Sequence, residues 1–167
     1  MQTYINPKLS DWSALTSRPT KEAQDLQKIV LDVFEKIQSE KDKALIDFTE
    51  RFDGVKLTSL EVPTEEIEEA KSLISEELKQ AIQLAASNIE KFHAVQREEV
   101  KVIETTKGVN CWRESRGIKN VGIYIPGGTA PLFSTTLMLG IPAKLADCEN
   151  IILCTPPNKE GKVHPAI

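Results

Sequence analysis

The chain has 167 residues, a net charge of −4 at pH 7 and an apolar fraction of 40%. This length allows one domain of ordinary size with a substantial buried core. The charge balance lacks the basic excess of nucleic-acid-binding proteins, and no apolar run reaches the roughly 20 residues of a membrane span. Because the amino terminus has no secretory pattern, we expect a cytoplasmic protein without nucleic-acid or membrane partners.

Residues 20–97 have the periodicity of helices. The first stretch repeats apolar residues at three- and four-residue spacing, which predicts a helix with one packed face: Leu26, Ile29, Val30, Val33, Phe34 and Ile37. A second helix is predicted from near Ser39 to Gly54, because glycine readily takes the left-handed conformation that ends helices. Its expected inward side chains are Leu45, Phe48 and Phe52.

Two acidic helix starts follow. Thr64 stands before Glu65-Glu66 and Ser75 before Glu76-Glu77, so each hydroxyl is a predicted N-cap with acidic residues placed against the helix dipole. The second of these helices is expected to run to about Gln96. The residues on its predicted packed face are Leu78, Ile82, Ala85, Ile89 and Phe92.

The pattern then changes to alternation. Residues 100–114 alternate on either side of Thr105-Thr106-Lys107-Gly108, which has the composition of a tight turn and predicts a β-hairpin. Further along, residues 121–125 and 151–155 are apolar runs separated by a glycine loop at 126–131 and a crossover at 132–146. A crossover of that length permits parallel pairing of the two strands. Pro142 is expected to divide the crossover into two short helices near Gly140-Ile141.

The glycine loop is the first candidate site, because open α/β sheets bind ligands beyond the carboxyl ends of parallel strands. It matches neither G-x-G-x-x-G nor a P-loop, and the residues alone leave open whether it binds a ligand or only turns the chain. Tyr124 can contact a ligand, but an aromatic residue in a buried strand favours a core position. Nearby hydroxyls can bind a ligand oxygen or cap the helix, Ser134 being the best cap: Thr129, Ser134, Thr135 and Thr136.

Metal chemistry has little support in these residues. The three cysteines, which have no C-x-x-C spacing and stand in apolar segments, are expected to be reduced core thiols: Cys111, Cys148 and Cys154. His93 and His164 are too far apart in sequence for a local histidine metal site.

Residues 121–144, VGIYIPGGTAPLFSTTLMLGIPAK, closely resemble histidinol dehydrogenase. The resemblance continues through residues 146–148 and 151–157, and upstream through residues 48–54 and 89–93. It implies a zinc-dependent homodimer of histidine biosynthesis that oxidises L-histidinol to L-histidine through L-histidinal with NAD.

The resemblance also implies an α/β fold with two incomplete Rossmann-like domains. Residues 1–19 would be an arm, residues 20–120 the mainly helical part of the first domain with its hairpin, and residues 121–167 the beginning of the second, NAD-contacting domain. Tyr124 matches the family's NAD-contacting tyrosine, and Pro126, Gly127 and Gly128 adjoin it. The family's catalytic residues and zinc ligands lie later in a longer chain, so none is assigned here, and residues 1–167 alone are expected to be inactive.

Two other functions stay open at this point. In the first, the helices form a non-enzymatic module that binds a partner, and the glycine loop is only a turn. In the second, the protein is an NAD-dependent dehydrogenase of another amino alcohol. The residues that would separate these specificities lie outside the sequence given.

Overall fold

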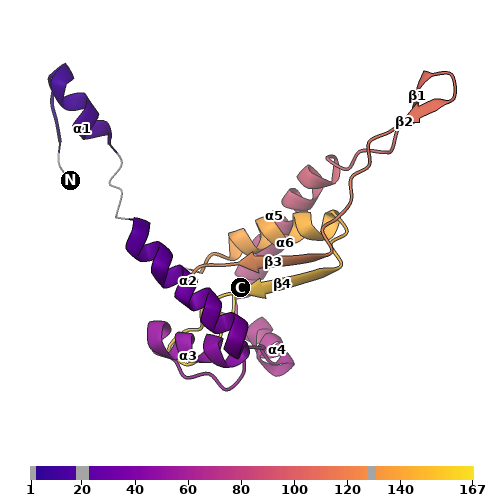
Figure 1. Ribbon diagram of the computed structural model, residues 1–167. Helices are drawn as coiled ribbons and strands as arrows, with labels where there is room; N and C mark the ends of the chain where they lie inside the picture. Colours follow the sequence, from indigo (N-terminus) through magenta and orange to yellow (C-terminus); the bar gives the residue numbers. More distant parts are fainter. Residues whose placement is uncertain (1–2, 18–22, 128–130) are drawn as a thin grey trace. The chain divides into compact units, whose positions relative to one another are not determined.

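The computed structural model describes residues 3–17, 23–127 and 131–167 (Figure 1). The chain divides into two compact units, Met1–Leu45 and Ile46–Ile167. Helices and strands are both present, which confirms the α/β class. The predicted domain boundaries after residues 19 and 120 stay predictions. Within the described ranges, no helix is long and apolar enough to cross a membrane.

The first unit contains η1 (Leu9–Asp11), α1 (Trp12–Thr16) and α2 (Ala23–Glu40). The predicted helix is confirmed in α2, but the expectation that its apolar stripe packs is wrong. Leu26 is 64% exposed and Phe34 is 60% exposed. Periodicity predicts which side of a helix is apolar, whereas the element that covers that side has to be supplied by tertiary structure.

The next helix, α3 (Asp42–Asp53), begins later than the predicted Ser39. Lys41 separates it from α2 by taking a left-handed φ of +53°, and Gly54, with φ +71°, ends it as predicted. Phe48 stacks on Phe52 with ring centroids 5.7 Å apart. The expectation that Phe52 points inward is wrong, because it is 61% exposed.

The helices α4 (Thr64–Leu73) and α5 (Glu76–Ala94) differ in their N-caps. Ser75 is the N-cap of α5 as predicted, and its hydroxyl accepts the N–H of Leu78. Thr64 is not an N-cap: Pro63 takes the extended cap conformation, so Thr64 already lies inside the helix. Phe92 is 66% exposed, so the predicted packed face of α5 does not include it.

The predicted hairpin is confirmed as β1 (Ile103–Thr106) paired antiparallel with β2 (Val109–Cys111). Its strands are shorter than the alternating pattern, and a register shift lies within the pairing, between Glu104 and Thr106. The connection consists of Lys107 and Gly108, and Gly108 takes a left-handed φ of +83°, which favours glycine. The Glu104 carboxylate accepts the Gly108 N–H at 2.7 Å.

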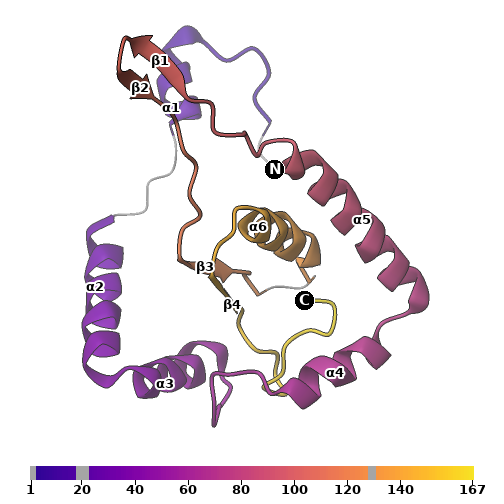
Figure 2. The same cartoon turned by 90° about the vertical axis from the view of Figure 1, so that its right-hand side faces the viewer.

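The strand, turn, helix and strand expected after residue 120 form a parallel unit: β3 (Asn120–Tyr124), α6 (Phe133–Leu145) and β4 (Asn150–Cys154). The register runs from Asn120 opposite Asn150 to Tyr124 opposite Cys154. Figures 1 and 2 show α6 beside the two strands, with α5 along α6. The helix α6 contacts α5, β3 and β4. Ile123 of β3 is buried. Because side chains alternate along a strand, every second residue of β3 faces the interior.

Pro142 does not divide the crossover, so the prediction of two short helices is wrong. It lies in the last turn of α6, where only three helical residues follow it, and the helix stays continuous. α6 then ends in a Schellman motif, in which the N–H of Asp147 bonds to Lys144 and that of Cys148 to Ala143. Asp147 takes the left-handed position, φ +58°, that usually holds glycine.

The buried core of the described residues is small, which corrects the expectation drawn from chain length. Exposed apolar side chains lie on several elements, among them Leu84 of α5 and Ile152 of β4. Cys111 and Cys154 are exposed free thiols and Cys148 is half-buried, so the prediction of core cysteines is wrong. The buried hydrophobic residues are Ala44, Val55, Ile123, Ile125 and Ala166.

Candidate functional site

The candidate site lies where β3 and β4 end, because parallel strands bring their carboxyl ends to one edge of a sheet. The N–H of Ile125 donates to the carbonyl of Cys154 at 2.9 Å, one residue beyond the paired strands. The Ile125 side chain is fully buried. The turn that follows β3 therefore starts from a well-anchored point. We call residues 124–127 the β3 turn.

Tyr124 is the last residue of β3 and is 62% exposed. The expectation from residue type alone, a core position, is wrong. Since side chains alternate along a strand, Tyr124 lies on the opposite face from buried Ile123 and Ile125. Its ring can contact a ligand at the carboxyl edge of the sheet.

Pro126 and Gly127 continue the β3 turn and are exposed, whereas Gly128 and Thr129 lie outside the described residues. Gly127 approaches Pro156, which follows β4: a Cβ atom built on Gly127 would lie 3.3 Å from Cγ of Pro156. The two turns thus lie close together. Sequence reasoning did not single out Pro156, and the signal that was available is its place directly after the second strand.

α6 begins beside this turn without a side-chain cap. Its N-cap position is Leu132, which has no side chain able to accept a hydrogen bond, so the prediction of Ser134 as the cap is wrong. The first-turn N–H groups of an uncapped helix are available to water or to an anionic ligand. Among the described side chains, Thr136 holds the one buried polar atom without a hydrogen-bond partner, its Oγ1.

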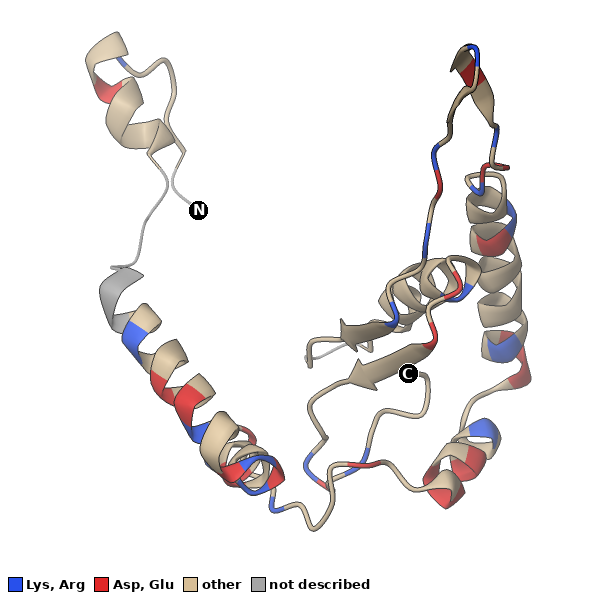
Figure 3. Ribbon diagram, turned by 45° about the vertical axis from the view of Figure 1, so that its right-hand side comes forward, with Lys and Arg blue, Asp and Glu red and all other residues tan. Residues whose placement is uncertain are grey.

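Charge is scarce around the β3 turn. Neither β3 nor β4 contains a charged residue, as Figure 3 shows for the two strands. The shifted pKa values belong to ion pairs elsewhere. A hydrogen bond from Arg116 lowers the pKa of Glu114, and a hydrogen bond to Glu69 raises the pKa of Lys162.

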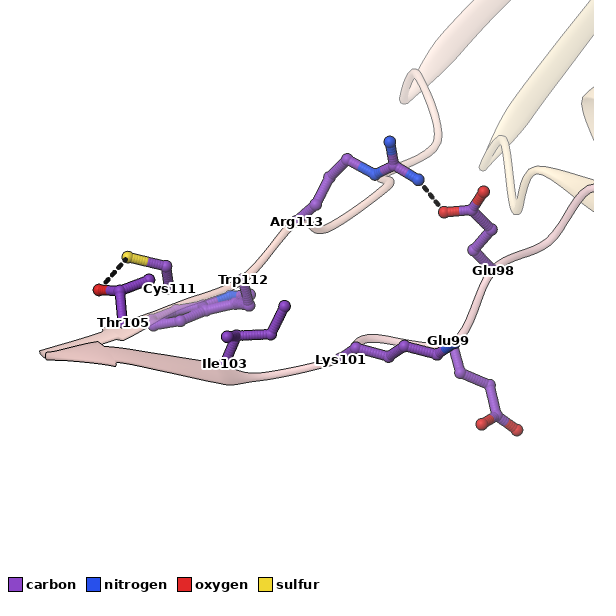
Figure 4. Close-up of a pocket in the computed structure, with 8 residues that line it drawn as sticks. All are labelled: Glu98, Glu99, Lys101, Ile103, Thr105, Cys111, Trp112 and Arg113. Atoms are coloured by element: carbon purple, nitrogen blue, oxygen red, sulfur yellow. Dashed lines mark hydrogen bonds and ion pairs between the residues drawn. The ribbon is translucent and has the colours of Figure 1, made fainter.

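A shallow pocket of about 710 Å³ lies between the two legs of the hairpin (Figure 4). Arg113 pairs with Glu98 across its mouth, and the walls include Ile103 and Trp112, both at least 60% exposed. A site that buries a small ligand has enclosed walls, so this pocket is a weaker candidate than the β3 turn. In the ranges that the structure describes, no three metal-binding side chains cluster closely enough to hold an ion.

Comparison with known proteins identifies relatives along the whole chain. The family model described as histidinol dehydrogenase matches residues 16–167. A histidinol dehydrogenase from Bacteroides thetaiotaomicron is 51% identical over 167 residues, covering 100% of this chain and 39% of the relative. The histidine biosynthesis trifunctional protein of Candida albicans is 49% identical over 156 residues, covering 90% of this chain and 18% of that protein.

A solved structure extends the match to three dimensions. The crystal structure of histidinol dehydrogenase from Elizabethkingia anophelis superposes with a TM-score of 0.88 at 65% sequence identity. The match covers 100% of this chain and 39% of that one. The chain therefore spans about two fifths of the length of such relatives.

Proposed function

Because this chain belongs to the histidinol dehydrogenase family, we propose that the protein oxidises L-histidinol to L-histidine through L-histidinal, the last steps of histidine biosynthesis. The observation that carries the proposal is the 65% identity to a solved histidinol dehydrogenase over every residue of the chain. NAD, when bound, would supply the hydride acceptor for both oxidations. The chain covers only part of its relatives, so this activity is proposed for the complete protein.

We propose the β3 turn as part of the NAD site. Exposed Tyr124 offers its ring to the cofactor, and Pro126 and Gly127 carry the chain away at the carboxyl edge of the sheet. The start of α6 lies next along the chain, and the first-turn N–H groups of a helix suit the pyrophosphate of a dinucleotide. Gly128 belongs to the same proposal through the family resemblance alone.

This part of the chain acts on the cofactor by binding and orienting it. An exposed aromatic ring and backbone donors hold a dinucleotide in place without exchanging protons with the substrate. Zinc does not fit the described residues, because no three suitable side chains cluster there. We therefore assign no metal ligand among them, and we assign no acid or base because the family resemblance implies that those residues lie later in a longer chain.

Two further features of the complete protein are proposed with its activity. We propose a homodimer, as the family resemblance implies. We also propose a cytoplasmic location, which the three free cysteines support, because reducing compartments keep thiols unpaired.

The absorbance of NADH tests the activity, with L-histidinol and NAD supplied to the complete enzyme in the presence of zinc. Tyr124→Ala should raise the KM for NAD about tenfold, and Tyr124→Phe should stay within about threefold of wild type if the ring makes the contact. Phe92→Ala is the matched control, since Phe92 is 66% exposed and lies on α5. It should leave both KM values unchanged.

Each outcome has a distinct meaning. An active wild type whose KM for NAD is insensitive to Tyr124→Ala would contradict the proposed NAD contact but not the activity. A wild type that oxidises another amino alcohol, and not L-histidinol, would contradict the proposed substrate. A wild type that neither binds nor reduces NAD would favour the partner-binding module.

A further inference from the structure

Gly127 and Pro156 lie close together where the turns after β3 and β4 meet. A Cβ atom built on Gly127 would lie 3.3 Å from Cγ and 3.4 Å from Cβ of Pro156. Carbon atoms in ordinary contact are about 3.5–4.0 Å apart. A side chain at position 127 would therefore push against the proline ring.

Backbone conformation does not require glycine at position 127. Its φ lies outside the left-handed region, whereas Gly54, Gly108 and Gly161 have φ values of +71°, +83° and +78°. An alanine could adopt the Gly127 backbone without strain. The restriction that the structure places on this position is the proximity of Pro156.

The chain is anchored two residues before Pro156 and again seven residues after it. Before it, the carbonyl of Cys154 accepts the N–H of Ile125 at 2.9 Å and ties β4 to the start of the β3 turn. After it, the Glu66 side chain on α4 accepts the N–H of Val163 at 2.8 Å. The proline ring is thus presented to Gly127 by a segment that is anchored to the sheet and to α4.

We propose that Pro156 is a positioning residue for the cofactor site: its ring sets where Gly127 lies and, through Gly127, the course of the β3 turn after Tyr124. Pro156 acts through Gly127 and does not itself contact NAD. The proposal rests on the proposed function, because it takes the β3 turn to bind NAD.

A double-mutant cycle in the complete enzyme tests this role. In Gly127→Ala the added methyl group displaces the β3 turn, so the KM for NAD should rise about tenfold, while kcat and the KM for L-histidinol stay within about twofold. Pro156→Ala removes the ring that sets where Gly127 lies, so by itself it should also raise the KM for NAD several-fold. It also makes room for the methyl group of Gly127→Ala. The double variant should therefore return the KM for NAD to within about threefold of wild type.

Gly140→Ala is the matched control, because a Cβ atom built there meets nothing within 4 Å. It makes the same chemical change, and the KM for NAD should not move. A nuclear Overhauser effect between the Gly127 α protons and the Pro156 ring protons should be present in the wild type. That measurement reports the contact whether or not NAD is bound.

The outcomes separate this inference from the proposed function. If the wild type uses NAD but Gly127→Ala and Pro156→Ala raise the KM for NAD additively, the positioning role is wrong. A missing Overhauser effect overturns it as well. If the wild type neither binds nor reduces NAD while the Overhauser effect is present, the proposed function has failed although the contact is real, and the positioning role falls with it.

Discussion

The segment that leads into β3 passes the carboxyl end of α6 so closely at Gly117 that no side chain fits. A Cβ atom built there would overlap the carbonyl oxygen of Ala146 and would lie 2.9 Å from both the carbonyl carbon and oxygen of Asp147. All three are backbone atoms. They belong to the Schellman motif that ends α6, so they cannot rotate away as a side chain would.

Gly117→Ala should therefore weaken the β3–β4 unit. Overpacking typically costs about 1–3 kcal/mol, and the upper value applies where backbone has to move. Alanine recovers about 0.4–1 kcal/mol by restricting the unfolded chain. The net loss is about 2 kcal/mol, roughly a thirtyfold change in the equilibrium between closed and open states.

Native-state hydrogen exchange at the Ile125 amide measures this loss, because that N–H is bonded to Cys154 where β3 meets β4. Its exchange should accelerate about thirtyfold in Gly117→Ala. Gly122→Ala is the control, since a Cβ atom built on Gly122 in β3 meets nothing within 4 Å. Equal exchange rates in the two variants would refute the steric reasoning.

Three local contacts give further expected outcomes. Ser75→Ala removes the acceptor of the Leu78 N–H and should lower the stability measured by thermal denaturation by about 1 kcal/mol. Ser75→Asp keeps an acceptor at this position and should retain the wild-type stability. The NMR titration midpoint of Glu114 should lie below its ordinary pKa of 4.5 and return to it in Arg116→Gln. Any stability from that pair is present above the ordinary pKa and is lost as pH falls through the lowered pKa. Pro142→Ala supplies a missing N–H within α6 and should raise stability in the same denaturation assay by about 1–3 kcal/mol; no gain would mean that packing of the ring compensates for the missing bond.

Features with local causes were predictable from the sequence. Ser75 followed by two glutamates predicts a capped helix start, and the structure places the Ser75 hydroxyl on the N–H of Leu78. Gly54 and Gly108 mark chain turns that need a left-handed φ, which other residues rarely adopt. In each case the residue itself carries the physical reason for the structure.

Features that depend on tertiary packing were not predictable in this way. Pro142 is a strong local helix breaker, yet α6 stays continuous while contacting α5 and both strands. Phe52 and Phe92 belong to apolar stripes, but each is more than 60% exposed. Periodicity gives the orientation of a stripe and says nothing about the presence of a cover.

The candidate site divides along the same line. The position of the β3 turn at the carboxyl ends of two parallel strands was predictable from strand, crossover and strand. The exposure of Tyr124 follows from its position on the face of β3 opposite buried Ile123 and Ile125. Its proposed role in binding NAD came from the family resemblance and not from its residue type. The contact of Gly127 with Pro156 joins residues far apart in sequence, so only the structure reveals it.

The outer edge of β4, which pairs only with β3 among the described strands, also bears on aggregation during folding. Residues 150–155 of this edge contain neither charge nor proline, the composition of segments that pair between molecules and nucleate amyloid. Glu149 precedes the segment, and Pro156-Pro157 follows it. A charge and prolines at such flanks act as gatekeepers against aggregation. Pro156 is therefore expected to guard the nascent chain as well, and its replacement should shorten the lag time of aggregation during refolding.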